Sequence, residues 1–183
     1  MSTSAHRGER GFNLIEVLIA MAMLSTVLLA VVTLFFMGRR NVYSGRQMTR
    51  ATSVVVNAGE DLSALTAREI FEAFTIPANE TKGNRTIAGV NYTNAIFRST
   101  TDTSKDNTAD GYAYLARWKA LLPAERVSGG RVTLVILPSQ QADAADVTTA
   151  RVLRVRVITE WTEATRARHV FSDTVKFNRR LGV

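Results

Sequence analysis

Residues 12–37 read FNLIEVLIAMAMLSTVLLAVVTLFFM, and this stretch decides the architecture of the chain. From residue 17 to residue 37 no side chain is charged, and the polar side chains are those of Ser25, Thr26 and Thr33. A helix rises about 1.5 Å per residue, so a helix over this stretch would exceed the roughly 30 Å hydrocarbon core of a membrane. We therefore expect a membrane-spanning helix. Because the helical pattern continues past Arg40, removal of the stretch as a secretory signal peptide is disfavoured.

The composition of the whole chain hides this segment. The chain has 183 residues, of which 46% are hydrophobic, and a net charge of +7. These averages describe an ordinary basic globular domain. Outside the apolar segment and the leader before it, about 145 residues remain, which is enough for one domain with one core. The sequence therefore predicts one domain and one anchor.

The residue types also limit the chemistry. The chain has no cysteine, which excludes disulfides, thiolate metal sites and a cysteine nucleophile. Its two histidines, His6 and His169, cannot form a zinc site of the usual kind. Neither a Gly-x-Ser-x-Gly elbow nor a phosphate-binding glycine loop is present. The sequence thus predicts a protein without a metal, a cofactor or a catalytic site, and not an enzyme.

Glu16 is the unusual residue of the apolar segment. A carboxylate at the centre of a membrane costs about 2.5 to 3.5 kcal/mol on insertion scales, so it needs a partner. The nearest basic residue before it is Arg10, and none follows within two helical turns. A free amino group created by cleavage before Phe12, on this chain or on a neighbour, would supply the partner. The alternative is that Glu16 lies at the level of the lipid headgroups and stays hydrated.

Residues 10–20, Arg-Gly-Phe-Asn-Leu-Ile-Glu-Val-Leu-Ile-Ala, closely resemble the class III signal of type IV prepilins and type II secretion pseudopilins. The resemblance implies that prepilin peptidase cuts after Gly11 and that Phe12 becomes the N-methylated terminus. It also implies that Glu16, the fifth residue of the mature chain, guides assembly. The sequence departs from the family pattern at Asn13, where threonine is commoner, and in having no proline in the apolar helix.

The same resemblance implies a division of the chain and a location. We expect a leader at 1–11, a transmembrane and filament-core helix at 12–37, an amphipathic continuation at 38–66 and a periplasmic or extracellular head domain at 67–183. Basic residues flank both ends of the span, and a count of them alone would place the C-terminal side in the cytoplasm. The resemblance implies the reverse orientation: a single pass through the bacterial inner membrane, N-terminus in the cytoplasm, before assembly into a pilus or pseudopilus.

Beyond the membrane, the hydrophobic pattern predicts an α+β roll in which the long helix packs on an antiparallel sheet. One helical stripe is formed by Met48, Ala51, Val55, Ala58, Leu62 and Leu65. Thr66 and Glu69 have the spacing of a capping box, which predicts a short helix ending near Phe74. The polar segment 77–111 is interpreted as a variable loop region with strand-like patches at 85–90 and 92–98. Its acidic residues between Asp102 and Asp110 fit a solvated turn better than a calcium loop, because the EF-hand pattern fails.

Strands are expected at 112–119, 131–137, 152–161 and 169–177. In the third of these, Leu153, Val155, Val157 and Trp161 alternate with Arg154, Arg156 and Glu160, which predicts one buried and one wet face. In the last, Phe171, Val175 and Phe177 share one face. The family resemblance implies the same architecture.

The leading functional hypothesis is a structural subunit, a minor pilin of the PilV or PilW kind, assembled into a type IV pilus, in a priming or tip complex that serves adhesion or twitching motility. The implied partners are major and minor pilins, prepilin peptidase, the inner-membrane assembly platform and inner-membrane lipid. One alternative is a minor pseudopilin of a type II secretion system. The other is a competence pilin that binds DNA through a basic face formed by Arg154, Arg156, Lys176, Arg179 and Arg180.

Overall fold

A computed structural model describes residues 13–74, 83–102, 108–124, 127, 129–138, 152–163 and 165–177. Its elements in chain order are α1 (Leu14–Ala64), α2 (Ala67–Phe74), β1 (Gly83–Ile87), β2 (Val90–Ser99), α3 (Ala109–Ala124), β3 (Arg131–Pro138), β4 (Val152–Glu163) and β5 (Arg166–Phe177). The chain divides into two compact units, residues 1–43 and residues 44–183. The long helix α1 supplies residues to both units.

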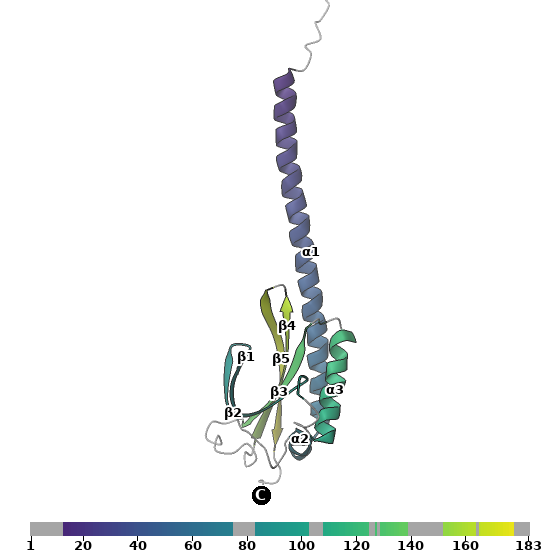
Figure 1. Cartoon of the computed structure of the whole chain (residues 1–183), viewed down its shortest axis with the longest axis vertical. Helices are drawn as coiled ribbons and strands as arrows, with labels where there is room; N and C mark the ends of the chain where they lie inside the picture. The colour runs from purple at the N-terminus through teal and green to yellow at the C-terminus, as the bar shows by residue number, and fades with distance from the viewer. Residues whose placement is uncertain are drawn as a thin grey trace, which may run out of the picture. The chain divides into compact units, whose positions relative to one another are not determined.

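The second unit is built on a five-stranded antiparallel sheet in the order β1-β2-β3-β4-β5. Figure 1 shows α3 and residues 44–64 of α1 on one side of the sheet, and the β1–β2 hairpin curling away on the other side. The expected fold class is therefore confirmed: a long N-terminal helix packed on an antiparallel sheet, the pilin-like α+β fold.

One face of the sheet forms the main core together with α1, α2 and α3. The buried positions of α1 are Gln47, Ala51, Val54, Val55, Ala58 and Leu62. Small alanines let the helix approach the sheet closely, and Trp118 of α3 and Leu134 of β3 fill the space beside them. The stripe expected from the sequence is confirmed except at its start: Met48 is 46% exposed, and Gln47 is buried in its place.

The opposite face of the sheet forms a second, smaller core. The β1–β2 hairpin brings Ile87, Tyr92 and Phe97 against Val135 of β3 and Ile158 of β4. The sheet is therefore buried on both faces over its central strands. The strand-like patches expected at 85–90 and 92–98 are confirmed with shifted bounds as β1 and β2. The turn at Ala88 and Gly89 falls inside the first patch and joins the two strands as a hairpin, so this part of 77–111 is not a loop region.

Residues 112–119 form part of helix α3, so the strand predicted there was wrong. Leu115, Trp118 and Leu122 are buried and recur at spacings of three and four, which is the period of a helix. Thr108 caps the helix by accepting a hydrogen bond from the Gly111 N–H at 3.1 Å. The same hydroxyl donates to the Ala73 carbonyl at the end of α2. Gly111 allows this approach, since a Cβ there would overlap the Ala73 carbonyl.

The capping box at the start of α2 is confirmed. The Thr66 N–H donates to Glu69 Oε2 at 2.7 Å, and the Glu69 N–H donates to Thr66 Oγ1 at 3.3 Å. The first of these bonds lowers the pKa of the Glu69 carboxyl. The helix then runs to Phe74, as the sequence predicts.

The alternation along β4 is also confirmed. Leu153, Val155, Val157 and Trp161 lie in the core shared with α1. The intervening Arg154 is exposed, while Arg156 and Glu160 are half-buried on the other face. On β5, Phe171, Val175 and Phe177 are at least half exposed and occupy alternate positions on that other face.

Candidate functional site

The first candidate site is the start of α1. Asn13 lies just before the helix, and its carbonyl accepts hydrogen bonds from the Glu16 N–H at 2.8 Å and from the Val17 N–H at 3.3 Å. Glu16 thus lies in the first turn, where the partial positive charge of the helix terminus favours a carboxylate. Its side chain is exposed. Among the described residues, no basic group forms an ion pair with Glu16.

Gly11 and Phe12, the predicted cleavage and methylation sites, lie outside the described residues. Their roles therefore stay predictions. What the structure adds is their context, because regular helix starts two residues after Phe12.

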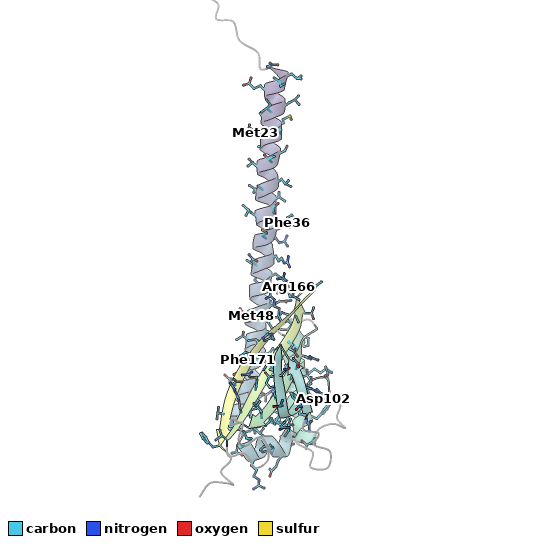
Figure 2. The ribbon with its side chains drawn as sticks, turned by 90° about the vertical axis from the view of Figure 1, so that its left-hand side faces the viewer. Met23, Phe36, Met48, Asp102, Arg166 and Phe171 are labelled. Carbon is cyan, nitrogen blue, oxygen red and sulfur yellow. The ribbon has the colours of Figure 1, made fainter. Side chains whose placement is uncertain are left out.

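The apolar part of α1 is exposed along its whole length from Leu14 to Met37. Figure 2 shows the side chains of Met23 and Phe36 standing out from the helix. Such a surface is not stable in water, and α1 is the one helix in the described part of the chain that is long and apolar enough to cross a membrane. Either lipid or other apolar helices must cover it.

The few hydroxyl groups in this part of α1 are satisfied within the helix. Ser25 donates to the Met21 carbonyl, Thr26 to the Met23 carbonyl and Thr33 to the Leu29 carbonyl, each at 2.8 Å. Because these bonds need no water, the hydroxyls add little cost when the helix is surrounded by apolar groups. The segment is therefore suited to a dry environment.

The second candidate site is the predicted basic face on β4 and β5. Arg154 and Arg156 both bind Asp173 of β5: the Arg154 Nη2–Asp173 Oδ2 and Arg156 Nε–Asp173 Oδ1 distances are 2.7 and 2.5 Å. The register places Arg156 directly opposite Asp173. One carboxylate therefore neutralises part of the charge of the two arginines.

Arg156 is held on several sides. Its guanidinium lies 4.3 Å from the centre of the Phe171 ring and donates to Tyr92 Oη at 3.0 Å. The hydrogen bond to Asp173 raises the pKa of Arg156 and is the main cause that lowers the pKa of the Asp173 carboxyl. Sequence reasoning missed Asp173, because its pairing with Arg156 depends on the register between β4 and β5.

Lys176 does not share the face of these arginines. It lies opposite Leu153, whose side chain is in the core beneath α1, and its Nζ donates to the Ser63 carbonyl near the end of α1 at 2.8 Å. Arg179 and Arg180 lie outside the described residues. The structure thus brings Arg154 and Arg156 together and separates Lys176 from them, while DNA binding itself stays a prediction.

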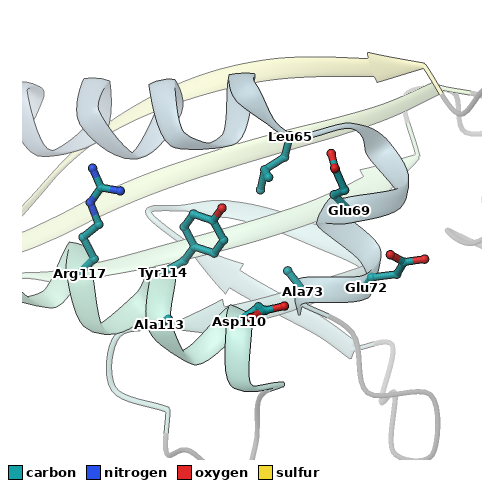
Figure 3. Close-up of a pocket in the computed structure, with 8 residues that line it drawn as sticks. All are labelled: Leu65, Glu69, Glu72, Ala73, Asp110, Ala113, Tyr114 and Arg117. Carbon is teal, nitrogen blue, oxygen red and sulfur yellow. The ribbon is translucent and has the colours of Figure 1, made fainter.

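A third feature is a pocket of about 470 Å³ where the end of α1 meets α2 and α3. Figure 3 shows its lining, which consists of Leu65, Glu69, Glu72, Ala73, Asp110, Ala113, Tyr114 and Arg117. Several of these charges are already engaged: Glu72 binds Arg68 at 2.5 Å, and Arg117 lies 3.2 Å from Asp61. In the described parts of the chain, no three histidine, cysteine or acidic side chains come together as a metal site.

Comparison with known protein families gives one match: a model of the prokaryotic N-terminal methylation motif covers residues 6–32. Comparison with curated proteins gave no match, and neither did comparison with solved structures. The matched residues include Gly11, Phe12 and Glu16. The motif is that of the class III prepilin signal, which implies processing by prepilin peptidase and assembly with pilins.

The chain therefore resembles prepilins in two independent features: a methylation motif at the start of an exposed apolar helix, and a sheet domain with a pilin-like fold.

Proposed function

We propose that this protein is a minor pilin: a structural subunit cleaved after Gly11, N-methylated at Phe12 and assembled through α1 into a type IV pilus. The observation that carries the proposal is the apolar part of α1, exposed from Leu14 to Met37 directly after the methylation motif. The inner membrane covers this surface before assembly. The apolar helices of neighbouring pilins cover it afterwards.

In the proposed assembly step, Glu16 pairs with the amino group of Phe12 on an adjacent subunit. Two opposite charges inside an apolar helix bundle offset the desolvation of each other, and a subunit in the wrong axial position would leave both unpaired. The pair therefore sets the register of the filament. The free side chain of Glu16 on the first turn of α1 supports this role.

We test the role of Glu16 by replacing it with alanine. Glu16→Ala should leave membrane insertion and cleavage intact and should strongly reduce the amount of the protein in sheared filaments, measured by immunoblot. Glu60→Ala is the matched control, because Glu60 is also an exposed acid on α1 but lies in the second unit. Incorporation of Glu16→Ala at the level of the control would refute the assigned role.

Cleavage is tested separately. Gly11→Leu should block prepilin peptidase, so that mass spectrometry finds the full precursor. The unchanged protein should give a chain that begins at methylated Phe12. If Gly11→Leu yields the same mature mass as the unchanged protein, the cleavage site is elsewhere.

The minor role and the type of filament are tested by counting the copies of this protein in purified filaments. We expect few copies of this protein relative to the major pilin in sheared pili, located at the tip or in a priming complex. A subunit as abundant as the major pilin would contradict the minor role. Recovery in a secretion pseudopilus and not in pili would favour the alternative of a type II pseudopilin.

A further inference from the structure

Two arginines mark the point where the apolar part of α1 ends. Arg39 and Arg40 are the first charged residues after Glu16, and both are exposed. Neither forms an ion pair with another residue in the described ranges. Two adjacent guanidinium groups, which are always charged, concentrate positive charge at this point of the helix.

Their distance from Glu16 places them relative to a membrane. At about 1.5 Å per residue, Glu16 and Arg39 are roughly 35 Å apart along the helix axis. A bilayer has a hydrocarbon core of about 30 Å and a total thickness of about 40 to 45 Å with its headgroups. When the intervening apolar residues fill the hydrocarbon, Glu16 therefore lies in one headgroup layer and the arginine pair in the other.

The side chains around the pair fit this depth. Phe35 and Phe36, about one turn earlier, are 64% and 63% exposed and form an edge-to-face pair with ring centroids 6.5 Å apart. Their rings fill the outer hydrocarbon, while the long arginine side chains reach outward to the interface. Successive residues point about 100° apart on a helix, so Arg39 and Arg40 can contact different lipid molecules.

We propose that Arg39 and Arg40 bind the phosphate groups of anionic phospholipids in the leaflet on the head-domain side of the membrane. This inference rests on the membrane stage of the proposed function. A guanidinium binds phosphate oxygens through two parallel hydrogen bonds, which suits arginine at this position. Basic residues are normally depleted on the non-cytoplasmic side of a membrane, so the pair is unusual at this position.

The test uses the full chain in liposomes of phosphatidylcholine and phosphatidylglycerol. Electron paramagnetic resonance of spin-labelled lipids measures the association of each lipid with the protein. We expect phosphatidylglycerol to be favoured about fivefold, the effect of one basic side chain at an anionic surface, and the preference to fall with added salt. Arg39→Gln/Arg40→Gln should bring the ratio close to one.

Arg46→Gln/Arg50→Gln is the matched control. It removes the same charge from the same helix, at positions that lie about 10 Å and 15 Å or more beyond Arg39 along the axis. The control should keep the lipid preference. No preference in the unchanged protein, or an equal loss in both double variants, would overturn the proposal.

Two further outcomes separate this inference from the proposed function. If amide hydrogen exchange shows residues 17–38 unprotected in the liposomes, the membrane stage and the lipid contact both fail. If these residues are protected but the lipid preference is missing, the lipid contact alone fails. If Arg39→Gln/Arg40→Gln keeps the lipid preference and instead loses incorporation into filaments, the arginines bind a neighbouring subunit and the lipid assignment is wrong.

Discussion

At the scale of single residues, the side chain of Asp173 connects several others. Its carboxylate holds Arg154 and Arg156 together, and only 24% of its side chain is exposed. Arg156 in turn contacts Tyr92 from the β1–β2 hairpin. The β1–β2 hairpin, β4 and the edge strand β5 are therefore linked through Arg156 and the Asp173 carboxylate.

Replacing Asp173 by asparagine should lower the free energy of unfolding at neutral pH by about 1 to 2 kcal/mol, because two arginines lose their charged partner. The loss is measured by chemical denaturation of the detergent-solubilised chain, with tryptophan fluorescence as the signal. Glu72→Gln is the control: it breaks the Arg68–Glu72 pair, whose side chains are about 60% exposed, and should cost clearly less than Asp173→Asn because solvent screens the pair. Equal losses in the two variants would contradict the role of Asp173.

Asp173 also makes the free energy of unfolding depend on pH. Hydrogen bonds from Arg156 and then Arg154 lower the pKa of Asp173 in the folded state, so the stabilisation is present above the ordinary carboxyl pKa of about 4 and is lost as the pH falls through the lowered value. Between about pH 5 and pH 2, unfolding free energy should fall less steeply in Asp173→Asn than in the unchanged protein. If the unfolding free energies of the two proteins fall in parallel with pH, Asp173 does not cause the pH dependence.

The candidate assembly residue could be identified from sequence alone, whereas the Asp173 cluster could not. Glu16 is conspicuous because it is an acid beside a long apolar run, which is a local signal. The pairing of Arg156 with Asp173 depends on the register between β4 and β5. A shift of one residue would move Asp173 to the other face of the sheet, and the alternation of residues within each strand does not determine that shift.

At the scale of elements, the β1–β2 hairpin has an unfavourable turn. Ala88 and Gly89 have φ angles of 53° and 78°, so both positions adopt the left-handed region. Such a turn prefers Asn-Gly, because alanine pays a steric cost there of about 1 kcal/mol or more. Ala88 therefore makes the folded protein less stable than it would be with a residue that favours the left-handed region at this position.

We expect Ala88→Asn to raise the free energy of unfolding by about 0.5 to 1 kcal/mol, measured by the same denaturation experiment. The matched control is Ala116→Asn on the exposed face of α3, which should lower it by about 0.5 kcal/mol because asparagine is a poor helix former. A stabilising effect at both positions, or at neither, would show that the turn geometry is not the cause.

The elements that were correctly predicted have strong local signals. The long apolar stretch of α1, the capping box of α2 and the alternation in β4 are each visible within a short window. Helix α3 was missed because Tyr112, Tyr114 and Trp118 favour strands locally, while tertiary packing of Leu115, Trp118 and Leu122 selects the helical period. The two strands of the β1–β2 hairpin were recognised as strand-like patches, but their packing over a second core was missed because their polar exposed residues resemble a loop.

At the scale of the whole molecule, the division of α1 between two units predicts an independent head domain. Every buried residue of α1 lies at Gln47 or later, so a chain that begins at Ser44 keeps the complete described core. This shortened chain should be soluble without detergent, with a near-ultraviolet circular dichroism spectrum like that of the full chain. Aggregation or loss of that spectrum would show that residues before Ser44 are needed for folding.

The attachment of α1 to the β4–β5 hairpin has a mechanical consequence. Near one end of the covering segment, Ser44 Oγ donates to Glu163 Oε2 at 3.0 Å, and near the other end the Ser63 carbonyl accepts from Lys176 Nζ at 2.8 Å. Between these two contacts Ala51, Val54, Ala58 and Leu62 are buried in the core that α1 shares with the sheet. A pull along the helix axis would load all of these contacts in shear at the same time and could not peel them off one by one, which fits the filament subunit proposed above.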